Sequence, residues 1–267
     1  MVENNSNQLR ATVLQTDIEW QSPQANLTRL DTLLHEAPAS DLYLLPEMFA
    51  TGFSLQPELP GVADAAEKTL EWMHCQACKL NAAIVGSMPI NSNGHYYNRL
   101  SFVTPDKTDF YDKKHLFSYG GENQAYTPGC ARVVVAFRGV RFLLQVCYDL
   151  RFPVFARNRN DYDAMLYVAN WPTSRIAVWD ALLRARALEN QCYVLASNRI
   201  GTDPTCTYPG HSQVIDAYGR VEANGEEGAE CYVSTTLDMK RLTTFRQQFP
   251  VLEDADDFFL ADTQVRP

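Results

Sequence analysis

Short apolar runs alternate with stretches of helical periodicity along this chain, and this alternation constrains its fold more than any other feature. One helical stretch begins at Ser22-Pro23 and ends before Pro38, and a second covers residues 64–80. The apolar runs short enough to be strands cover residues 9–16, 41–45 and 82–86. Strands and helices that alternate in this way predict an α/β fold built of layers.

Hairpins interrupt this alternation in the middle of the chain and near its end. The predicted turns lie at Asn93-Gly94, Arg138-Gly139, Tyr218-Gly219 and Asn224-Gly225. After Cys147 a helix is expected to begin, and the strand, helix and strand that follow cover residues 163–169, 176–189 and 192–197. No linker or repeat separates these elements, so residues 1–267 are expected to form a single domain with mixed sheets.

The two ends of the chain differ from the rest in composition. Residues 1–8 are polar and rich in asparagine, and we expect them to be disordered. They have neither the basic region nor the apolar region of a signal peptide. Residues 243–267 are acidic but keep four phenylalanines. We therefore expect this C-terminal segment to pack on the body of the protein or across a dimer.

The overall composition excludes some classes of partner. Lys and Arg total 23 against 32 for Asp and Glu, so the net charge of −9 disfavours binding to nucleic acid. The longest apolar runs are far shorter than the roughly 20 residues of a membrane span. The seven cysteines are an odd number in a mid-sized chain, which favours a reducing cytoplasm and free thiols over a disulfide framework.

Three reactive side chains follow apolar strands, where α/β folds usually place their chemistry. Cys147 ends such a run at the predicted start of a helix, where the helix dipole and free N–H groups favour a thiolate. A buried structural cysteine is an equally good interpretation of this segment. Glu47 lies between apolar residues and is either a general base or a solvated loop carboxylate.

The third candidate is Lys113, beside Lys114 and His115. Its ammonium could stabilise an oxyanion, or the two lysines could form a solvated turn. His115 could instead act as the base for Cys147. The residues alone do not decide between Lys113 and His115.

Three segments together resemble the signature segments of the nitrilase superfamily of carbon–nitrogen hydrolases. They are "LLPEMFATGF" around Glu47, "YDKKHLF" around Lys113 and "VCYDLRFP" around Cys147, and their order and wide spacing agree with the family. The similarity continues through "GENQAYTPG", "ANWPTSRIAVWDALLRARALENQ" and "GHSQVIDAYG". The resemblance implies a four-layer α-β-β-α sandwich and a homodimer or a higher homo-oligomer.

The resemblance also implies a role for each candidate residue. Glu47 would be the general base, Lys113 the oxyanion stabiliser and Cys147 the nucleophile. Glu122, in "GGENQAY", matches a second glutamate that helps to hold the lysine and the substrate. Tyr148 would act through its backbone N–H. A hydrolase of this kind requires no metal and no organic cofactor.

Within the family, "CYDLRFP" and the downstream "NWP" look like the ω-amidase branch. Those enzymes hydrolyse the terminal amide of small α-keto acid amides such as 2-oxoglutaramate and 2-oxosuccinamate. The alternatives are another amidase, a nitrilase or a carbamoylase. Trp171 follows a predicted strand and could line the substrate pocket, and Arg175 is either a cation for an anionic substrate or a surface residue.

A pair of cysteines supports a different class of function. Cys75 and Cys78 form a C-x-x-C, with His74 and His95 as nearby candidates for further ligands. The pair lies within a predicted helix, and no second C-x-x-C follows it. A thiol-based zinc or redox protein is therefore the less favoured alternative.

Overall fold

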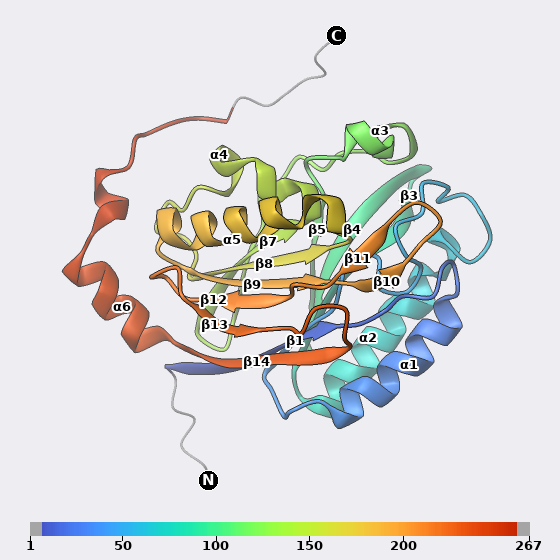
Figure 1. The fold of residues 1–267 in the computed structure, drawn as a ribbon, viewed down its shortest axis with the longest axis horizontal. Helices are drawn as coiled ribbons and strands as arrows, with labels where there is room; N and C mark the ends of the chain where they lie inside the picture. The colour runs from blue at the N-terminus through green and yellow to red at the C-terminus, as the bar shows by residue number, and fades with distance from the viewer. Residues whose placement is uncertain (1–6, 261–267) are drawn as a thin grey trace.

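Two six-stranded β-sheets pack face to face, and helices cover both outer faces (Figure 1). The computed structural model describes residues 7–260. Its layers follow the order helix, sheet, sheet, helix. The four-layer α-β-β-α sandwich implied by the family resemblance is therefore confirmed.

The first sheet has the strand order β14-β1-β2-β3-β4-β5. The strands are β1 (Gln8–Gln15), β2 (Leu42–Leu44), β3 (Ala83–Ser92), β4 (His95–Val103), β5 (Thr108–Asp112) and β14 (Cys231–Asp238). The central strands β1, β2 and β3 are parallel, and the outer strands are antiparallel to their neighbours. Two helices cover its outer face: α1 (Pro23–Glu36) and α2 (Ala66–Leu80), which is preceded by η1 (Ala63–Ala65). The helices contact the sheet through the apolar residues that recur along them at helical spacing.

The second sheet repeats this plan with the order β13-β12-β9-β8-β7-β6. Its strands are β6 (Val134–Phe137), β7 (Val140–Val146), β8 (Ala164–Ala169), β9 (Tyr193–Asn198), β12 (Gln213–Ile215) and β13 (Val221–Asn224). Helix α5 (Ile176–Asn190) and the short α4 (Pro153–Ala156) lie on its outer side. A separate hairpin of β10 (Ile200–Thr202) and β11 (Thr207–Pro209) follows β9.

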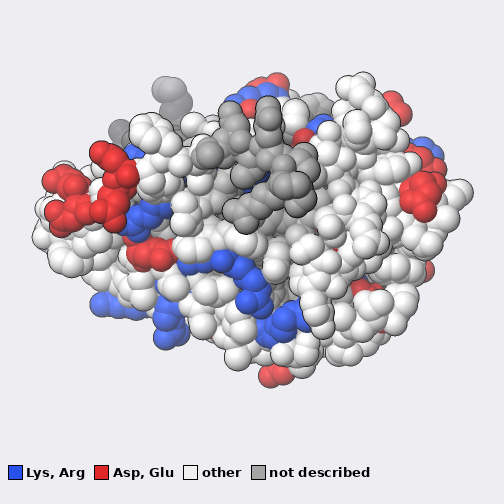
Figure 2. All heavy atoms as spheres, turned by 90° about the horizontal axis from the view of Figure 1, so that it is seen from above, with Lys and Arg blue, Asp and Glu red and all other residues white. Residues whose placement is uncertain are grey.

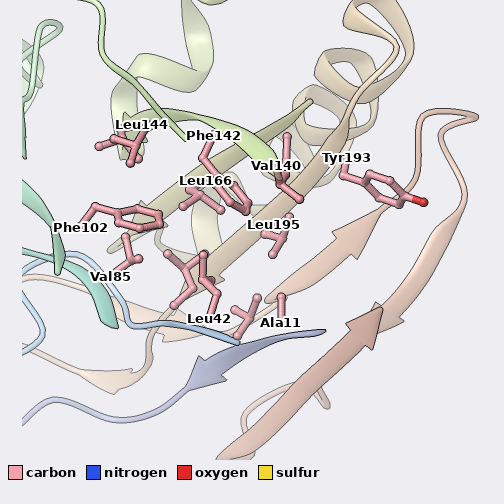
Figure 3. Packing of buried hydrophobic residues seen from close by; sticks show 14 of the residues in the cluster. Ala11, Leu42, Val85, Phe102, Val140, Phe142, Leu144, Leu166, Tyr193 and Leu195 are labelled. Atoms are coloured by element: carbon pink, nitrogen blue, oxygen red, sulfur yellow. The ribbon is translucent and has the colours of Figure 1, made fainter. Parts of the chain in front are cut away.

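The core between the sheets consists of alternate residues from the strands of both. Figure 3 shows Val85 and Phe102 of the first sheet opposite Phe142 and Leu166 of the second. The intervening residues of β8, such as Tyr167, face α5 instead. Because β8 is buried on both faces, it is apolar throughout. Full burial of each such side chain stabilises the fold by about 1.5–3 kcal/mol.

Three of the four predicted turns connect strands as expected. The turn at Asn93-Gly94 joins β3 to β4, that at Arg138-Gly139 joins β6 to β7, and Tyr218-Gly219 lies between β12 and β13. The first two have positive φ at both residues, as type I′ turns require.

The predicted turn at Asn224-Gly225 is wrong. The chain leaves β13 at Asn224 and crosses to β14 in the other sheet. Gly225 is needed there because a Cβ at this position would lie 2.5 Å from Oε1 of Gln15. The glycine therefore permits a close approach between segments.

Two other local expectations also need correction. Gln8, expected within the disordered start, is the first residue of β1, where it pairs with Asp238; residues 1–6 lie outside the described residues. The helix expected after Cys147 is a single short 3-10 segment, η3 (Cys147–Arg151), followed by α4.

The C-terminal segment begins in α6 (Met239–Gln248) and contacts the body through its first part. Arg246 donates to Asp163 and to the backbone oxygens of Tyr162 and Gln191, each at 2.9 Å. The chain then continues through η5 (Val251–Asp254). This segment lies at the left of Figure 1, and its exposed acidic residues lie toward the left end of Figure 2. Residues 261–267 lie outside the described residues, and a crossing to a second subunit stays a prediction.

All seven cysteines are free thiols. Between residues 7 and 260, no helix is both long enough and apolar enough to cross a membrane.

Candidate active site

Four reactive side chains from four separate segments of the chain meet at one site. Glu47 follows β2, Lys113 follows β5, Cys147 follows β7, and Glu122 begins the short α3 (Glu122–Ala125) after η2 (Ser118–Gly120). The side chains of Glu47 and Lys113 have no exposed surface. The same holds for Glu122. The two sheets therefore bring together residues that are up to a hundred positions apart in sequence.

Lys113 forms ion pairs with both glutamates. Its Nζ lies 3.0 Å from Oε1 of Glu47, and 3.0 and 2.8 Å from the two carboxylate oxygens of Glu122. Burial by itself lowers the pKa of Lys113, but Glu122 and Glu47 outweigh it and hold this pKa well above its usual value. Lys113 is therefore an ammonium at neutral pH.

Burial raises the pKa of Glu122, and the neighbouring ammonium of Lys113 opposes that rise. The backbone N–H of Phe117 also donates to Oε2 of Glu122, at 2.6 Å. Glu122 thus holds Lys113 together with Glu47.

Two asparagines that the sequence interpretation did not select hold Glu47 in place. Nδ2 of Asn98, in β4, donates to Oε1 of Glu47 at 2.8 Å and to Oε1 of Glu122 at 3.1 Å. The backbone N–H of Asn170 donates to Oε2 of Glu47 at 2.8 Å, and its Nδ2 donates to the backbone oxygen of Glu47, also at 2.8 Å. Asn170 directly follows the apolar run of β8, so the strand-end criterion could have found it.

Cys147 adopts a backbone conformation that is unusual for a residue other than glycine. Its φ is +46°, in the left-handed region, where strain costs of order 1–3 kcal/mol. The residue begins η3, so the N–H groups of Cys147 and of the next residue, Tyr148, have no partner within that helix. The strained turn thus presents the thiol together with free backbone donors.

The expectation of a stabilised thiolate at Cys147 is wrong. Burial raises the pKa of this thiol well above its usual value, Glu47 adds to the rise, and Lys113 only partly opposes it. Cys147 is therefore protonated at rest and needs a base before it can react.

A cavity of about 450 Å³ opens onto this cluster. It is lined by Glu47, Lys113 and Cys147 and by aromatic rings, among them Trp20, Phe53, Phe117, Tyr148, Trp171 and Tyr208. All three expected substrate-binding residues, Tyr148, Trp171 and Arg175, belong to this lining.

Two arginines supply further positive charge to the cavity. The guanidinium of Arg175 lies 5.1 Å from the ring centre of Phe117, and that of Arg151 lies 5.3 Å from that of Trp171. Neither has an ion-pair partner within the part of the chain that the structure describes. The sequence interpretation did not select Arg151, although it lies in the same segment as Cys147.

His115 does not take the place of Lys113. Its Nδ1 lies 2.8 Å from Oδ1 of Asp149, and its ring stacks on Phe152 with ring centres 3.9 Å apart. The cavity lining contains Lys113 but not His115. The geometry therefore favours Lys113, and not His115, as the partner of the thiol.

The C-x-x-C pair lies on α2, away from this cavity. Cys75 and Cys78 are both exposed, and Sγ of Cys78 lies 3.7 Å from Nε2 of His74. Across residues 7–260, no group of three His, Cys, Asp or Glu side chains is arranged to hold a metal ion. The zinc alternative therefore has no complete ligand set in the described structure.

This chain is similar to known proteins over nearly its whole length. A family model described as carbon-nitrogen hydrolase matches residues 10–247, which include all four clustered side chains. The Omega-amidase YafV of Escherichia coli (strain K12) is 42% identical over 94% of this chain and 98% of its own. The 2-oxoglutaramate amidase of Bacillus subtilis (strain 168) is 33% identical over 90% of this chain and 95% of its own.

A solved structure has the same fold over nearly its whole length. The crystal structure of a CN-hydrolase superfamily protein from Xanthomonas campestris superposes with a TM-score of 0.91 at 41% identity, covering 95% of this chain and 99% of that one. That protein's structure carries an arsenic adduct in its active site.

Proposed function

Because this chain belongs to the carbon–nitrogen hydrolase family, we propose that it is an ω-amidase that hydrolyses the terminal carboxamide of small α-keto acid amides. The products are the keto acid and ammonia, and 2-oxoglutaramate or 2-oxosuccinamate is the expected substrate. The observation that carries the proposal is that the buried Glu47 and Lys113 and the half-buried Cys147 line one cavity, which also contains two arginines without ion-pair partners among the described residues.

The first half of the reaction forms a thioester. Glu47 accepts the proton of the Cys147 thiol, whose raised pKa makes a base necessary. The sulfur attacks the amide carbon, and the negative charge moves to the carbonyl oxygen. Lys113 and the backbone N–H of Tyr148 stabilise this oxyanion, and one such donor contributes about 2.7–4 kcal/mol. Glu47 then gives its proton to the nitrogen, the C–N bond breaks, and ammonia leaves.

The second half hydrolyses the thioester. Glu47 accepts a proton from water, the hydroxide attacks the thioester carbon, and the same donors stabilise the second oxyanion. The C–S bond breaks, and Glu47 returns the proton to the sulfur. Each step uses a group of this chain, so the proposal includes no metal and no organic cofactor.

The charges of the cavity support a keto acid as substrate. Arg151 and Arg175 can form charge-assisted hydrogen bonds with the carboxylate at the far end of the substrate. The one carboxylate in the described lining, Glu47, is already bonded to Lys113, Asn98 and Asn170. Glutamine and asparagine carry an α-ammonium group in place of the keto group. In this cavity that group would meet the cations Lys113, Arg151 and Arg175 and no free carboxylate, so these two amides are disfavoured as substrates.

The alternatives are another amidase, a nitrilase or a carbamoylase of the same family, since the cluster alone serves all of them. The two arginines favour the ω-amidase, because simple amides and nitriles carry no carboxylate for them to bind.

Assembly and location are part of the same proposal. We expect a homodimer or a larger homo-oligomer in the cytoplasm, with a small-molecule substrate and neither nucleic acid nor membrane as partner. Exposed apolar side chains near the ends of α5 and α6, among them Leu188 and Phe249, support a contact between copies. Light scattering of the purified protein tests this, and a monomer at micromolar concentration would contradict it.

The test of the reaction is a screen for ammonia release. We expect turnover of 2-oxoglutaramate or 2-oxosuccinamate that exceeds turnover of glutamine, simple amides, nitriles and carbamoyl compounds. Cys147→Ala should abolish it, whereas the matched control Cys130→Ala, at an exposed thiol, should retain it. Turnover of nitriles or carbamoyl compounds without turnover of the keto acid amides would contradict the proposal.

A further inference from the structure

Asp149 is a fully buried carboxylate that the reaction above does not use. It lies two residues after Cys147 and does not line the cavity. Four donors surround it: Tyr111 Oη at 2.8 Å, the backbone N–H of His115 at 3.0 Å, Nδ1 of His115 at 2.8 Å and the backbone N–H of Val146 at 2.9 Å. A buried carboxylate with this many donors is held in one position.

The donors come from the two segments that carry the reacting groups. Tyr111 lies two residues before Lys113, and His115 lies two residues after it. Val146 directly precedes Cys147. One carboxylate therefore joins the segment that carries the lysine to the segment that carries the cysteine, on both sides of Lys113.

The bond to Val146 also closes the turn at the nucleophile. Asp149 is the third residue of η3, and its carboxylate reaches back to the N–H of the residue before that helix. Cys147 lies between them with its φ of +46°. A strained residue persists where surrounding contacts determine its conformation, and this bond is one such contact. Tyr148 lies within the same turn, between Cys147 and Asp149.

We propose that Asp149 is a positioning residue, which sets the ammonium of Lys113 and the backbone N–H of Tyr148 relative to the sulfur of Cys147, with Tyr111 and His115 as its partners. The expected changes in kcat and KM rest on the proposed function. His115 acts here through its Nδ1–H, and it exchanges no proton with the substrate.

The proposal separates binding from chemistry. Arg151 and Arg175 hold the substrate carboxylate and are not among the partners of Asp149. Loss of the network should therefore lower kcat and leave KM almost unchanged, because it displaces donors that act in the transition state.

The variants remove one donor at a time. Tyr111→Phe deletes a hydroxyl, and His115→Phe keeps a ring on Phe152 but deletes Nδ1–H. His115→Asn restores a donor at the equivalent position. Tyr162→Phe is the matched control, since Tyr162 is an equally buried tyrosine whose hydroxyl donates to Ala156 at 2.6 Å, outside the cavity lining. Asp149→Asn removes the charge and replaces one of the two acceptor oxygens with an NH2 donor. The other variants keep the test decisive if this one does not fold.

The readouts are kcat, KM and the rate of Cys147 alkylation by iodoacetamide, measured by peptide mass spectrometry with exposed Cys75 as internal reference. We expect Tyr111→Phe and His115→Phe to lower kcat by about 10- to 100-fold. KM should stay within about 2-fold. Both variants should change the alkylation rate of Cys147 but not that of Cys75, and His115→Asn should restore both readouts. Tyr162→Phe should leave them as in the wild type.

Two results would overturn the proposal. In the first, Tyr111→Phe and His115→Phe have the same kcat and the same alkylation rate of Cys147 as the wild type. In the second, Tyr162→Phe shows the same losses as these two variants. Alkylation needs no substrate. A wild type that releases no ammonia from keto acid amides would therefore contradict the proposed function, while the alkylation rates would still decide the role of Asp149.

Discussion

Two regions of this molecule, the core between the sheets and the cluster of Glu47, Lys113 and Glu122, have almost no exposed side-chain surface but are held together by opposite means. The core is apolar on every side and is stabilised by burial of hydrocarbon. The cluster contains two carboxylates and one ammonium, and it depends on hydrogen bonds from Asn98, Asn170 and the backbone.

This difference separates stability from function. Truncation of an apolar side chain in the core costs packing energy but leaves nothing charged without a partner. Removal of a charge from the cluster leaves its partner buried and unpaired, and it also removes a reacting group. Changes in the two regions should therefore have distinct signatures in unfolding and in turnover.

Among changes in these two regions, the largest effect is expected from Lys113→Ala. It removes an oxyanion donor and leaves two carboxylates facing each other without a cation, so turnover should fall by at least about 100-fold. The free energy of unfolding should also fall by about 3–5 kcal/mol. Urea denaturation and ammonia release measure the two effects. Retention of both activity and stability would show that Lys113 does not hold the cluster together.

A change in the core should affect stability alone. Phe142→Ala removes a fully buried ring between the sheets and should lower the free energy of unfolding by about 3–5 kcal/mol. Below the unfolding transition, kcat should stay within about 2-fold of the wild type. A large loss of kcat in protein shown to be folded by circular dichroism would mean that the two regions are not separable.

The smallest effect concerns pH and the thiol of Cys147. Burial raises the pKa of this thiol in the folded state. As pH rises, the thiol therefore loses its proton in the unfolded chain before it does so in the folded protein. The contribution of the thiol to stability is therefore complete below pH 9.0, the ordinary value, and declines as pH rises above it. The decline is about 1.4 kcal/mol per pH unit until the folded pKa is reached.

Cys147→Ala lacks this contribution. Its stability should fall less than that of the wild type between pH 8 and pH 10, as measured by urea denaturation at each pH. Equal slopes in the two proteins would show that the surroundings of Cys147 do not raise the pKa of its thiol in the folded state.

The fold was predictable from the sequence where a period extended over several residues. The strand at β8 and the helix at α5 lie within a residue or two of their expected bounds, because each is apolar on the face or faces that it buries. The turn at Asn224-Gly225 was not predictable, because the reason for the glycine is a close approach to Gln15, more than two hundred residues away.

The site divides in the same way. Glu47 and Cys147 are polar side chains that follow the buried strands β2 and β7, and a local pattern can reveal that. Lys113 follows β5, which reads Thr-Asp-Phe-Tyr-Asp and is only partly buried, so its local signal is weaker. Asn98 lies inside β4, where nothing nearby marks it as a partner of Glu47. The pKa of the Cys147 thiol depends on burial by distant segments, which raises it. The expectation from the local helix terminus, that this pKa would be lowered, was therefore wrong in direction.

The central claim is that Cys147 carries the substrate as a thioester. Peptide mass spectrometry of protein mixed with 2-oxoglutaramate and quenched in acid within the first turnover tests it most directly. The account predicts the acyl group on the peptide that contains Cys147, and none on the same peptide in Cys147→Ala. An acyl group on another cysteine, or continued release of ammonia by Cys147→Ala, would contradict it.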